Sequence, residues 1–246
     1  MPEARPCKSL IRIGTAGWVN PRAHRKPPDR TGLEHYGTYF NCVEINSSFY
    51  RTHQRLTYER WAASTGRNFR FCVKIPRVIS HDAALRGCQD ELQVFWGGVK
   101  GLGKKLAVLL LQLPPKAEWE VRVARRFFGL LRSCTAVPVV CEPRHPSWSS
   151  AGAERLFKEF GISLVCADPV RLPRSWSLSD GIRYYRLHGS PRVYWSSYSP
   201  NQLEALSGRI ADECASFPEI WCIFDNTAAG AAWDSAKCLA ERLSPS

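Results

Sequence analysis

The sequence has no long hydrophobic run. Its longest apolar stretch covers residues 106–111, which is far too short to span a bilayer. The N-terminal stretch MPEARPCKSLIRIG also contains no apolar segment of the length that a signal peptide needs. These two absences exclude a membrane partner and predict a soluble protein of the cytoplasm.

The cysteines lack the paired spacing of a metal site or a disulfide framework. There are ten of them, but none forms a CxxC pair. Several lie inside apolar runs, where a free thiol behaves as a small hydrophobic group. This usage favours a reducing compartment. The residues concerned are Cys42, Cys72, Cys141, Cys166 and Cys222.

Acidic residues are scarce relative to basic ones. The formal net charge is +12, and 25 of the 34 cationic residues are arginines. A basic surface attracts polyanions, and arginine binds phosphate with two parallel hydrogen bonds. We therefore expect an anionic ligand, either nucleic acid or a phosphorylated small molecule. A GC-rich genome that favours arginine codons is the alternative explanation, and the oligomeric state cannot be inferred.

Short apolar runs alternate with stretches of helical spacing along the whole chain. Eight such runs fit a closed barrel of about 250 residues, whereas an open doubly wound sheet would need a GxGxxG motif after its first strand. The sequence there is GTAGW. We predict an α/β protein with one domain over 1–246, a single (β/α)8 TIM-type barrel whose closed parallel eight-stranded sheet carries outer helices, with an extension at 1–9 and a tail at 243–246. The predicted strands are 10–14, 42–45, 69–75, 106–113, 138–142, 162–167, 182–187 and 220–224.

Polar side chains gather where these runs end. A parallel barrel brings the carboxyl ends of all its strands to one mouth, which is where this fold builds its sites. The residues expected to converge there are Glu44, Asn46, Lys74, Gln112, Glu142, Arg144, His145, Asp168, Arg186, His188, Asp225 and Asn226.

Six motifs resemble those of the YecE-like family, a domain of unknown function. They occur in order as VEINSSFYR, FRFCVKIPRVISH, LLLQLPP, EPRHPSW, YRLHGSP and FDNTAAGAA, and the match runs from about Ile11 to Leu239. The resemblance implies a TIM-type barrel and no agreed activity. The family barrel is similar to that of endonuclease IV-type enzymes, which act on phosphodiesters with metal ions. One departure is the first loop, VNPRAHRKPPDR, which is basic where relatives carry aromatic residues, so the role of that loop stays open.

Glu44 and Glu142 are the leading candidates for the general acid and the general base. They follow strands that should face each other across the mouth, and two carboxylates in different surroundings can divide these roles. Each could instead pair with a neighbouring cation, such as Lys74 or Arg144. The same two carboxylates would suit glycoside hydrolysis if they lay roughly 5 to 9.5 Å apart.

Histidines and aspartates complete the predicted catalytic set. Arg186 and His188 alternate along one strand and should both point inward, although an internal ion pair with Asp168 or Asp225 is the simpler interpretation. Imidazole and carboxylate groups suit divalent metals. Because the sequence has no HxH or HExxH motif, we predict no metal site and no cofactor, with a divalent ion left open. The predicted catalytic residues are Glu44, Glu142, His145, His188, Asp168 and Asp225.

Aromatic residues are frequent after the strand ends, where they either stack on bases and sugars or pack the loops. Asn226 or Thr227 is expected to cap the last helix. The predicted ligand-binding residues are Asn46, Tyr50, Lys74, Gln112, Arg144, Trp148, Arg186, Tyr198 and Asn226.

Three functions remain compatible with the sequence. The preferred one is a protein that binds a phosphate-bearing ligand, and that acts on it as a hydrolase of the phosphodiesterase type, with Lys74, Arg144 and Arg186 holding phosphate. The second is a nucleic-acid-binding protein without catalysis. The third is a carbohydrate-active enzyme that uses Glu44 and Glu142.

Overall fold

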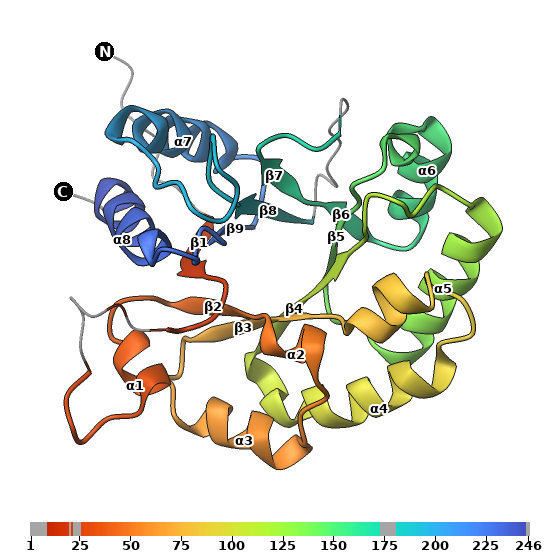
Figure 1. Ribbon diagram of the computed structural model, residues 1–246, viewed down its shortest axis with the longest axis horizontal. Coiled ribbons are helices and arrows are strands. Elements are labelled where there is room, and N and C mark those ends of the chain that lie inside the picture. The colour runs from red at the N-terminus through yellow and green to blue at the C-terminus, as the bar shows by residue number, and fades with distance from the viewer. Residues whose placement is uncertain (1–8, 20, 22–25, 173–180, 245–246) are drawn as a thin grey trace.

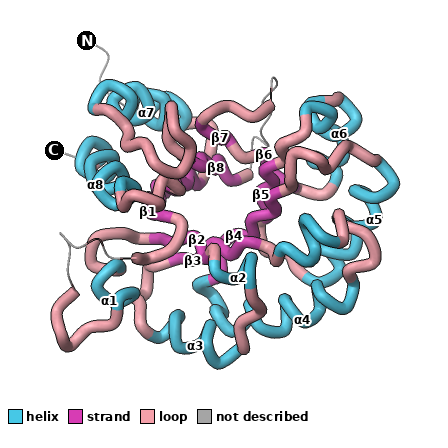
Figure 2. Tube along the Cα trace, viewed as in Figure 1, coloured by secondary structure: helices cyan, strands magenta, loops and turns pink. Residues whose placement is uncertain are grey.

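Parallel strands lie in the middle of the molecule and helices surround them. The computed structural model describes residues 9–19, 21, 26–172 and 181–244. Figure 1 shows the helices on the outside of the strands, and Figure 2 shows the same arrangement coloured by secondary structure. The alternation of strand and helix predicted from the sequence is therefore present.

The strands form two sheets, so the prediction of one closed eight-stranded barrel is wrong. A four-stranded sheet has the order β1-β9-β8-β7, and a five-stranded sheet has the order β2-β3-β4-β5-β6. Every pair within the two sheets is parallel. The strands are β1 (Leu10–Thr15), β2 (Cys42–Ile45), β3 (Arg70–Lys74), β4 (Leu106–Gln112), β5 (Val139–Glu142), β6 (Ile162–Leu164), β7 (Cys166–Asp168), β8 (Ile182–Leu187) and β9 (Glu219–Phe224).

Side chains separate β1 from β2. The Ile13 amide donates to Asn41 Oδ1 at 3.0 Å, and Asn41 Nδ2 donates to the Ile11 carbonyl at 2.9 Å. The Tyr36 hydroxyl accepts from the Thr15 amide at 2.8 Å. These contacts use backbone groups that a ladder between the two strands would have paired.

The gap between these strands is narrow all the same. The Tyr36 hydroxyl also donates to the Cys42 carbonyl at 3.0 Å, and a Cβ at Gly14 would come within 2.2 Å of that carbonyl oxygen. Only glycine fits at this position. Backbone pairing resumes at the carboxyl end, where Ala16 and Glu44 form an isolated bridge.

The second break between the sheets lies at Val165. One strand was predicted over 162–167, but its first part, β6, pairs with β5 and its last part, β7, pairs with β8. The Val165 amide donates to the Cys141 carbonyl at 2.9 Å. The chain therefore passes from one sheet to the other over a single residue, and the apolar run by itself carries no mark of this change of partner.

Helices lie between most of the strands, in keeping with the predicted alternation of apolar runs and stretches of helical spacing. In α5 the buried residues Ala124, Phe127, Phe128 and Leu131 fall on one face at helical spacing. The helices are α1 (Gly32–Tyr36), α2 (Ser47–Tyr50), α3 (Arg55–Ala63), α4 (Gln89–Val99), α5 (Val121–Cys134), α6 (Ala151–Glu159), α7 (Pro200–Glu213) and α8 (Ala231–Leu243). Short turns of other helix types cover η2 (Val78–Asp82), η3 (Lys100–Lys105) and η4 (Pro146–Ser149).

The predicted cap of the last helix is wrong. Helix α8 begins after Gly230, which has a φ of 80° and gives no side-chain cap. Asn226 is fully buried, and its side-chain amide donates to the Ser196 carbonyl at 3.0 Å. It is therefore used to hold a neighbouring loop.

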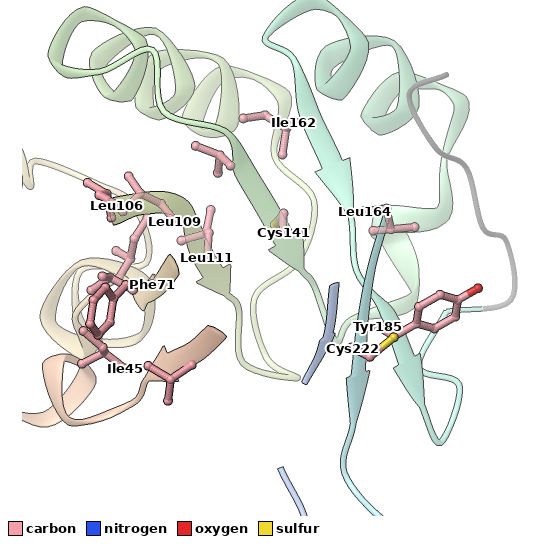
Figure 3. Packing of buried hydrophobic residues seen from close by; sticks show 14 of the residues in the cluster. Ile45, Phe71, Leu106, Leu109, Leu111, Cys141, Ile162, Leu164, Tyr185 and Cys222 are labelled. Atoms are coloured by element: carbon pink, nitrogen blue, oxygen red, sulfur yellow. The ribbon is translucent and has the colours of Figure 1, made fainter. Parts of the chain in front are cut away.

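Alternate strand residues pack on opposite sides of the sheets. The outward residues pack beneath the helices, as Figure 3 shows for Ile45, Phe71, Leu111 and Cys141. The inward residues form a second, smaller apolar cluster between the sheets. It contains Ala16, Cys42, Cys72, Val108, Leu110, Val140, Val165, Ile182, Tyr184, Trp221 and Ile223.

Two further expectations concern the ends of the chain and the membrane. The described part of the chain has no helix with the length and apolar character of a bilayer span. Location in the cytoplasm and the division into one domain, an extension and a tail stay predictions. Within the basic first loop, residues 20 and 22–25 lie outside the described residues.

Candidate functional site

A buried cluster of charged side chains lies at the carboxyl ends of both sheets. Each member except His188 follows an inward apolar residue by two positions, and His188 follows Arg186 by two, so the alternation of the strand points them to the interior. Direct contacts between residues of both sheets show that the carboxyl ends converge, as predicted. The cluster consists of Glu44, Lys74, Gln112, Glu142, Arg186, His188 and Asp225, all of them buried.

Arg186 on β8 lies at the centre of this cluster. Its Nη2 donates to Glu44 Oε1 at 2.8 Å, and its Nη1 donates to Glu142 Oε2 at 2.9 Å. Nη2 also forms an ion pair with Asp225 Oδ2 at 2.9 Å. One guanidinium, 1% exposed, thus holds three carboxylates from three strand ends.

Glu44 has a second partner in the interior. The hydroxyl of Tyr184 donates to Glu44 Oε2 at 2.9 Å, and both residues are fully buried. Tyr184 precedes Arg186 by two positions and therefore shares its face of β8. The sequence interpretation missed this residue, although its alternation with Arg186 and His188 was the signal that could have identified it.

His188 joins two of the carboxylates. Its Nδ1 lies 3.0 Å from Asp225 Oδ2, and its Nε2 lies 3.1 Å from Glu142 Oε1. Burial alone lowers the pKa of an imidazole, but the hydrogen bonds to Asp225 and Glu142 outweigh it and raise the pKa of His188. The protonated ring can donate to both neighbours.

Glu142 and Asp225 stay ionised despite their burial. Burial by itself raises the pKa of Glu142, but Arg186 and His188 hold it well below its usual range. Asp225 behaves in the same way, and its pKa is lowered. Burial also opposes ionisation of Arg186, yet the three carboxylates raise its pKa well above the usual value.

Lys74 differs from the other cations of the cluster. It is 7% exposed, and its ammonium has no hydrogen bond or ion pair with any residue that the structure describes. Its Nζ lies 4.2 Å from the centre of the Phe49 ring. Burial, followed by the charge of Arg186, lowers the pKa of Lys74 to about 8.

Arg144 borders the cluster on its outer side. Its Nε donates to Glu142 Oε1 at 2.9 Å, and its Nη2 donates to the Tyr194 hydroxyl at the long distance of 3.3 Å. The Tyr194 ring lies edge-on to His188 with centroids 5.6 Å apart. Tyr194 has a φ of 70°, a backbone conformation that non-glycine residues adopt rarely.

Other predicted residues lie beside the cluster. Asn46 Nδ2 reaches Asp225 Oδ1 at 3.5 Å, and Gln112 Oε1 accepts from Arg186 at 3.4 Å. Asp168 instead accepts from the Tyr198 hydroxyl at 2.7 Å. The same hydroxyl accepts from the Gly189 amide. Asp168 and Tyr198 are thus partners of each other, and the proposed Asp168 pair with Arg186 is not formed.

Three predicted residues lie apart from the cluster. The Nδ1 of His145 bonds to Ser147 at 2.8 Å within the loop of η4. Trp148 is buried beside Trp119 and donates to the Ala117 carbonyl at 2.8 Å, so it packs the loop. Tyr50 is 78% exposed.

The glycoside hydrolysis considered for Glu44 and Glu142 does not match this geometry. Arg186 binds both Glu44 and Glu142, so its guanidinium fills the position that a sugar ring would need between them. Within the described residues, no group of three or more histidine, cysteine, aspartate or glutamate side chains is arranged to hold a metal ion.

A cavity of about 450 Å³ borders the cluster at Glu142. It extends along β6 to β8 toward α7, and most of its wall is apolar. Charged groups of both signs also line it, namely Asp168, Arg171, Arg183 and Arg209 together with Glu142.

Comparison with known proteins gives consistent relatives. A family described as "Protein of unknown function DUF72" matches residues 12–246. The UPF0759 protein YecE of Escherichia coli (strain K12) is 34% identical over 176 residues, which cover 68% of this chain. The match spans 63% of YecE, so the chain covers less than two thirds of that relative. The UPF0759 protein YunF of Bacillus subtilis (strain 168) is 23% identical and covers 95% of both chains.

Two solved structures have the same fold. A DUF72 family protein (EF0366) from Enterococcus faecalis V583 superposes with a TM-score of 0.79 at 20% identity, covering 97% of this chain and 99% of that one. A DUF72 family protein (TM1631) from Thermotoga maritima MSB8 gives 0.78 at 21% identity, covering 95% and 99%. At these identities the likeness concerns the fold alone.

Proposed function

This chain belongs to the DUF72 family of proteins of unknown function, and we propose that it binds a phosphate-bearing ligand at the carboxyl ends of its strands and acts on it by acid–base chemistry. A nucleotide or nucleic acid is the class that the net charge of +12 favours. The resemblance to the YecE-like family that the motifs indicated is confirmed by the comparisons, but none of the relatives carries a named activity.

The proposal rests on a surplus of one cation: Arg144, on the border of the buried cluster, adds a fourth cationic group to a cluster that already balances three carboxylates with three cationic groups. The three carboxylates, Glu44, Glu142 and Asp225, are all bound to Arg186. The other cations of the site are Lys74, Arg144 and the raised-pKa imidazole of His188. Burying more positive than negative charge is costly, and an anion bound at this end of the sheets offsets the excess.

Arg144 is the residue best suited to bind the phosphate. The role first given to Arg186 is not available, because three carboxylates already occupy its donors. The Nε of Arg144 donates to Glu142, and its Nη2 makes only a long hydrogen bond to the Tyr194 hydroxyl. A guanidinium with free donors binds two phosphate oxygens at once.

His188 supplies the acid–base group of the proposal. A protonated imidazole held between two carboxylates can donate a proton to a leaving oxygen, and it then recovers a proton from solvent. The Tyr194 ring packs against His188, and its hydroxyl accepts from Arg144. A ligand phosphate on Arg144 would replace that weak contact.

Calorimetric titration of the full chain tests the binding step. The ligands are inorganic phosphate, adenosine monophosphate, ribose 5-phosphate, a short oligonucleotide and ribose. We expect the phosphate-bearing compounds to bind and ribose not to bind. Arg144→Gln should weaken binding by about tenfold or more, because a hydrogen bond to a charged group contributes about 1.5 to 3 kcal/mol.

The matched control is Arg125→Gln. Arg125 is an exposed arginine paired with Glu159, far from the cluster in the fold, and its loss should leave binding unchanged. Equal binding of ribose and ribose 5-phosphate would reject the proposal. Hydrolysis is measured separately with a nitrophenyl phosphodiester, and binding without turnover in that assay would restrict the function to binding.

A further inference from the structure

Lys74 is a buried amine at the carboxyl end of β3. The strand fixes its backbone, and the Ser48 hydroxyl donates to the Lys74 carbonyl at 2.7 Å. With 7% of the residue exposed, the side chain is held in a defined place among apolar and charged neighbours. A lysine that served only solubility would extend into water.

The carboxylates of the cluster do not pair with this amine. Glu44, Glu142 and Asp225 all act on its charge, yet each is bound to Arg186. In the described part of the chain, the recorded neighbour of the Lys74 ammonium is the face of the Phe49 ring. The lone pair of the neutral amine is therefore not tied up in a hydrogen bond.

Burial and a neighbouring cation favour the neutral amine. Desolvation first, and then Arg186, lower the pKa of Lys74 to about 8, against the ordinary 10.5. Near neutral pH a sizeable fraction of Lys74 is then unprotonated, whereas an exposed lysine is almost wholly protonated. An amine prepared in this way is a nucleophile for carbonyl carbon.

We propose that Lys74 forms a Schiff base with a phosphorylated aldehyde or ketone bound at this site. This deepens the proposed function and rests on it, since the phosphate of the same ligand is bound by Arg144. The two residues contact different parts of the ligand. The guanidinium of Arg144 offers a planar pair of donors for the phosphate, while the amine of Lys74 offers a lone pair for the carbonyl carbon.

The chemistry requires no other reactant. The Lys74 nitrogen attacks the carbonyl carbon, and the electron pair of the carbonyl bond moves to oxygen to give a carbinolamine. The carbinolamine hydroxyl leaves as water after it gains a proton, and the nitrogen loses its own protons to form the C=N bond. Carbonyl compound and amine thus yield imine and one water.

Within this proposal, His188 supplies the proton for the departing water. It is the imidazole of the cluster, and its two partners, Glu142 and Asp225, are among the groups whose charge acts on Lys74. His188 is the acid assigned to this step, and its raised pKa favours the protonated ring.

Reductive trapping in the full chain tests the proposal. The protein is incubated at about pH 7.5 with ribose 5-phosphate or dihydroxyacetone phosphate and sodium cyanoborohydride, and the modified lysines are located by peptide mass mapping. We expect adduct at Lys74 to exceed that at any other lysine by about tenfold or more, because far more of its amine is neutral. Ribose and dihydroxyacetone should be trapped at Lys74 several-fold more slowly.

Lys105 provides an internal control in the same digest. It too is partly buried, and its pKa is lowered, but its ammonium donates to the carbonyls of Ala62 at 2.6 Å and Thr65 at 2.7 Å. It should remain unmodified. Lys74→Arg should abolish the selective adduct and Lys105→Arg should not, and the distribution of adduct in the unaltered chain answers the question even where a variant fails to fold.

The outcomes separate this inference from the proposed function. Binding of ribose 5-phosphate without preferential adduct at Lys74 would overturn the Schiff base and leave phosphate binding intact. Adduct at Lys74 that forms equally with phosphorylated and unphosphorylated compounds, and that inorganic phosphate does not suppress, would retain the reactive amine and overturn its link to phosphate.

Discussion

Two buried arginines occupy opposite ends of the interior and are treated differently. Arg12 on β1, near the amino ends of the strands, is 5% exposed and pairs with Glu219, whose side chain is 23% exposed. It also donates to the Asn68 carbonyl at 3.1 Å and lies over the Trp221 ring at 5.6 Å. Arg186, at the carboxyl ends, is 1% exposed and binds three carboxylates.

The difference shows what each end is used for. One cation and one partly hydrated anion at Arg12 satisfy each other, which is enough for structural stability. At Arg186 the chain buries three carboxylates and adds Lys74, whose ammonium has no hydrogen bond or ion pair among the described residues. A structural ion pair does not require this many buried charged groups. Positions where a sequence departs from what would stabilise the fold are often functional sites.

Replacing each arginine by methionine should give the largest difference in stability between the two ends. Arg186→Met should lower the free energy of unfolding by about 3 to 5 kcal/mol at pH 7, since it leaves buried carboxylates without their cation. Arg12→Met should cost about 1.5 to 3 kcal/mol, because Glu219 remains in contact with water. Urea unfolding followed by circular dichroism measures both values.

The dependence on pH identifies the cause of the larger loss. The lowered pKa values of Glu142 and Asp225 stabilise the native fold above their ordinary range, and this contribution is lost as pH falls. The deficit of Arg186→Met should therefore shrink from pH 7 to pH 4. Equal deficits for the two variants, constant with pH, would show that the two arginines have the same role.

Lys74→Met should stabilise the protein at pH 7. The pKa of Lys74 falls from 10.5 to about 8, which corresponds to a cost on the order of 3 kcal/mol in the native state. Between these pH values the unfolded chain holds more protons, so the stability of the native protein rises with pH across that window. The advantage of methionine should be about 1 to 3 kcal/mol at pH 7 and should disappear above about pH 10.5. A variant that is less stable than the native chain at pH 7 would mean that Lys74 has a stabilising partner.

The composition of the cluster could be predicted from the sequence, because strand alternation determines it. Glu44, Lys74, Gln112, Glu142 and Arg186 each lie two positions beyond an inward apolar residue, so a shared face followed from period two alone. Their partners could not be predicted. Whether Arg186 would meet a ligand phosphate or three carboxylates depends on distances across the interior, which no local pattern encodes.

The division into two sheets was also beyond the sequence pattern. The separation of β1 from β2 depends on Asn41 and Tyr36, two ordinary residues whose side chains bond to strand backbones. The change of sheet at Val165 falls inside a continuous apolar run. Periodicity predicts which face of a strand is buried, and it does not predict which neighbour the strand pairs with.

A matched pair of tyrosines measures the effect of burial on one hydrogen bond. Tyr184 donates to the fully buried Glu44, while its neighbour Tyr185 donates to Glu213, whose side chain is 20% exposed. Tyr184→Phe should cost about 1.5 to 3 kcal/mol, because the carboxylate loses a donor that water cannot replace, and Tyr185→Phe should cost about 0.5 to 1.5 kcal/mol. Urea unfolding at pH 7 compares them, and the reverse order would show that the interior near Glu44 admits water.

His188 gives the smallest effect, and its sign distinguishes it from the other titrating groups. Its pKa is raised, so its stabilising contribution is complete below pH 6.5 and is lost as pH rises through its native pKa. His81 acts in the opposite sense: burial, followed by Lys74, lowers its pKa to about 4, so its contribution rises with pH and is complete by about 6.5. Lys74, whose pKa is about 8, acts in the same sense as His81, and its contribution rises as pH rises above about 7. A fall in stability as pH rises above 6.5 should therefore belong to His188, and His188→Gln, which keeps a donor but does not titrate, should reduce that fall. Urea midpoints at closely spaced pH values measure this slope, and an unchanged slope in the variant would assign the proton to another group and remove His188 as the acid of the cluster.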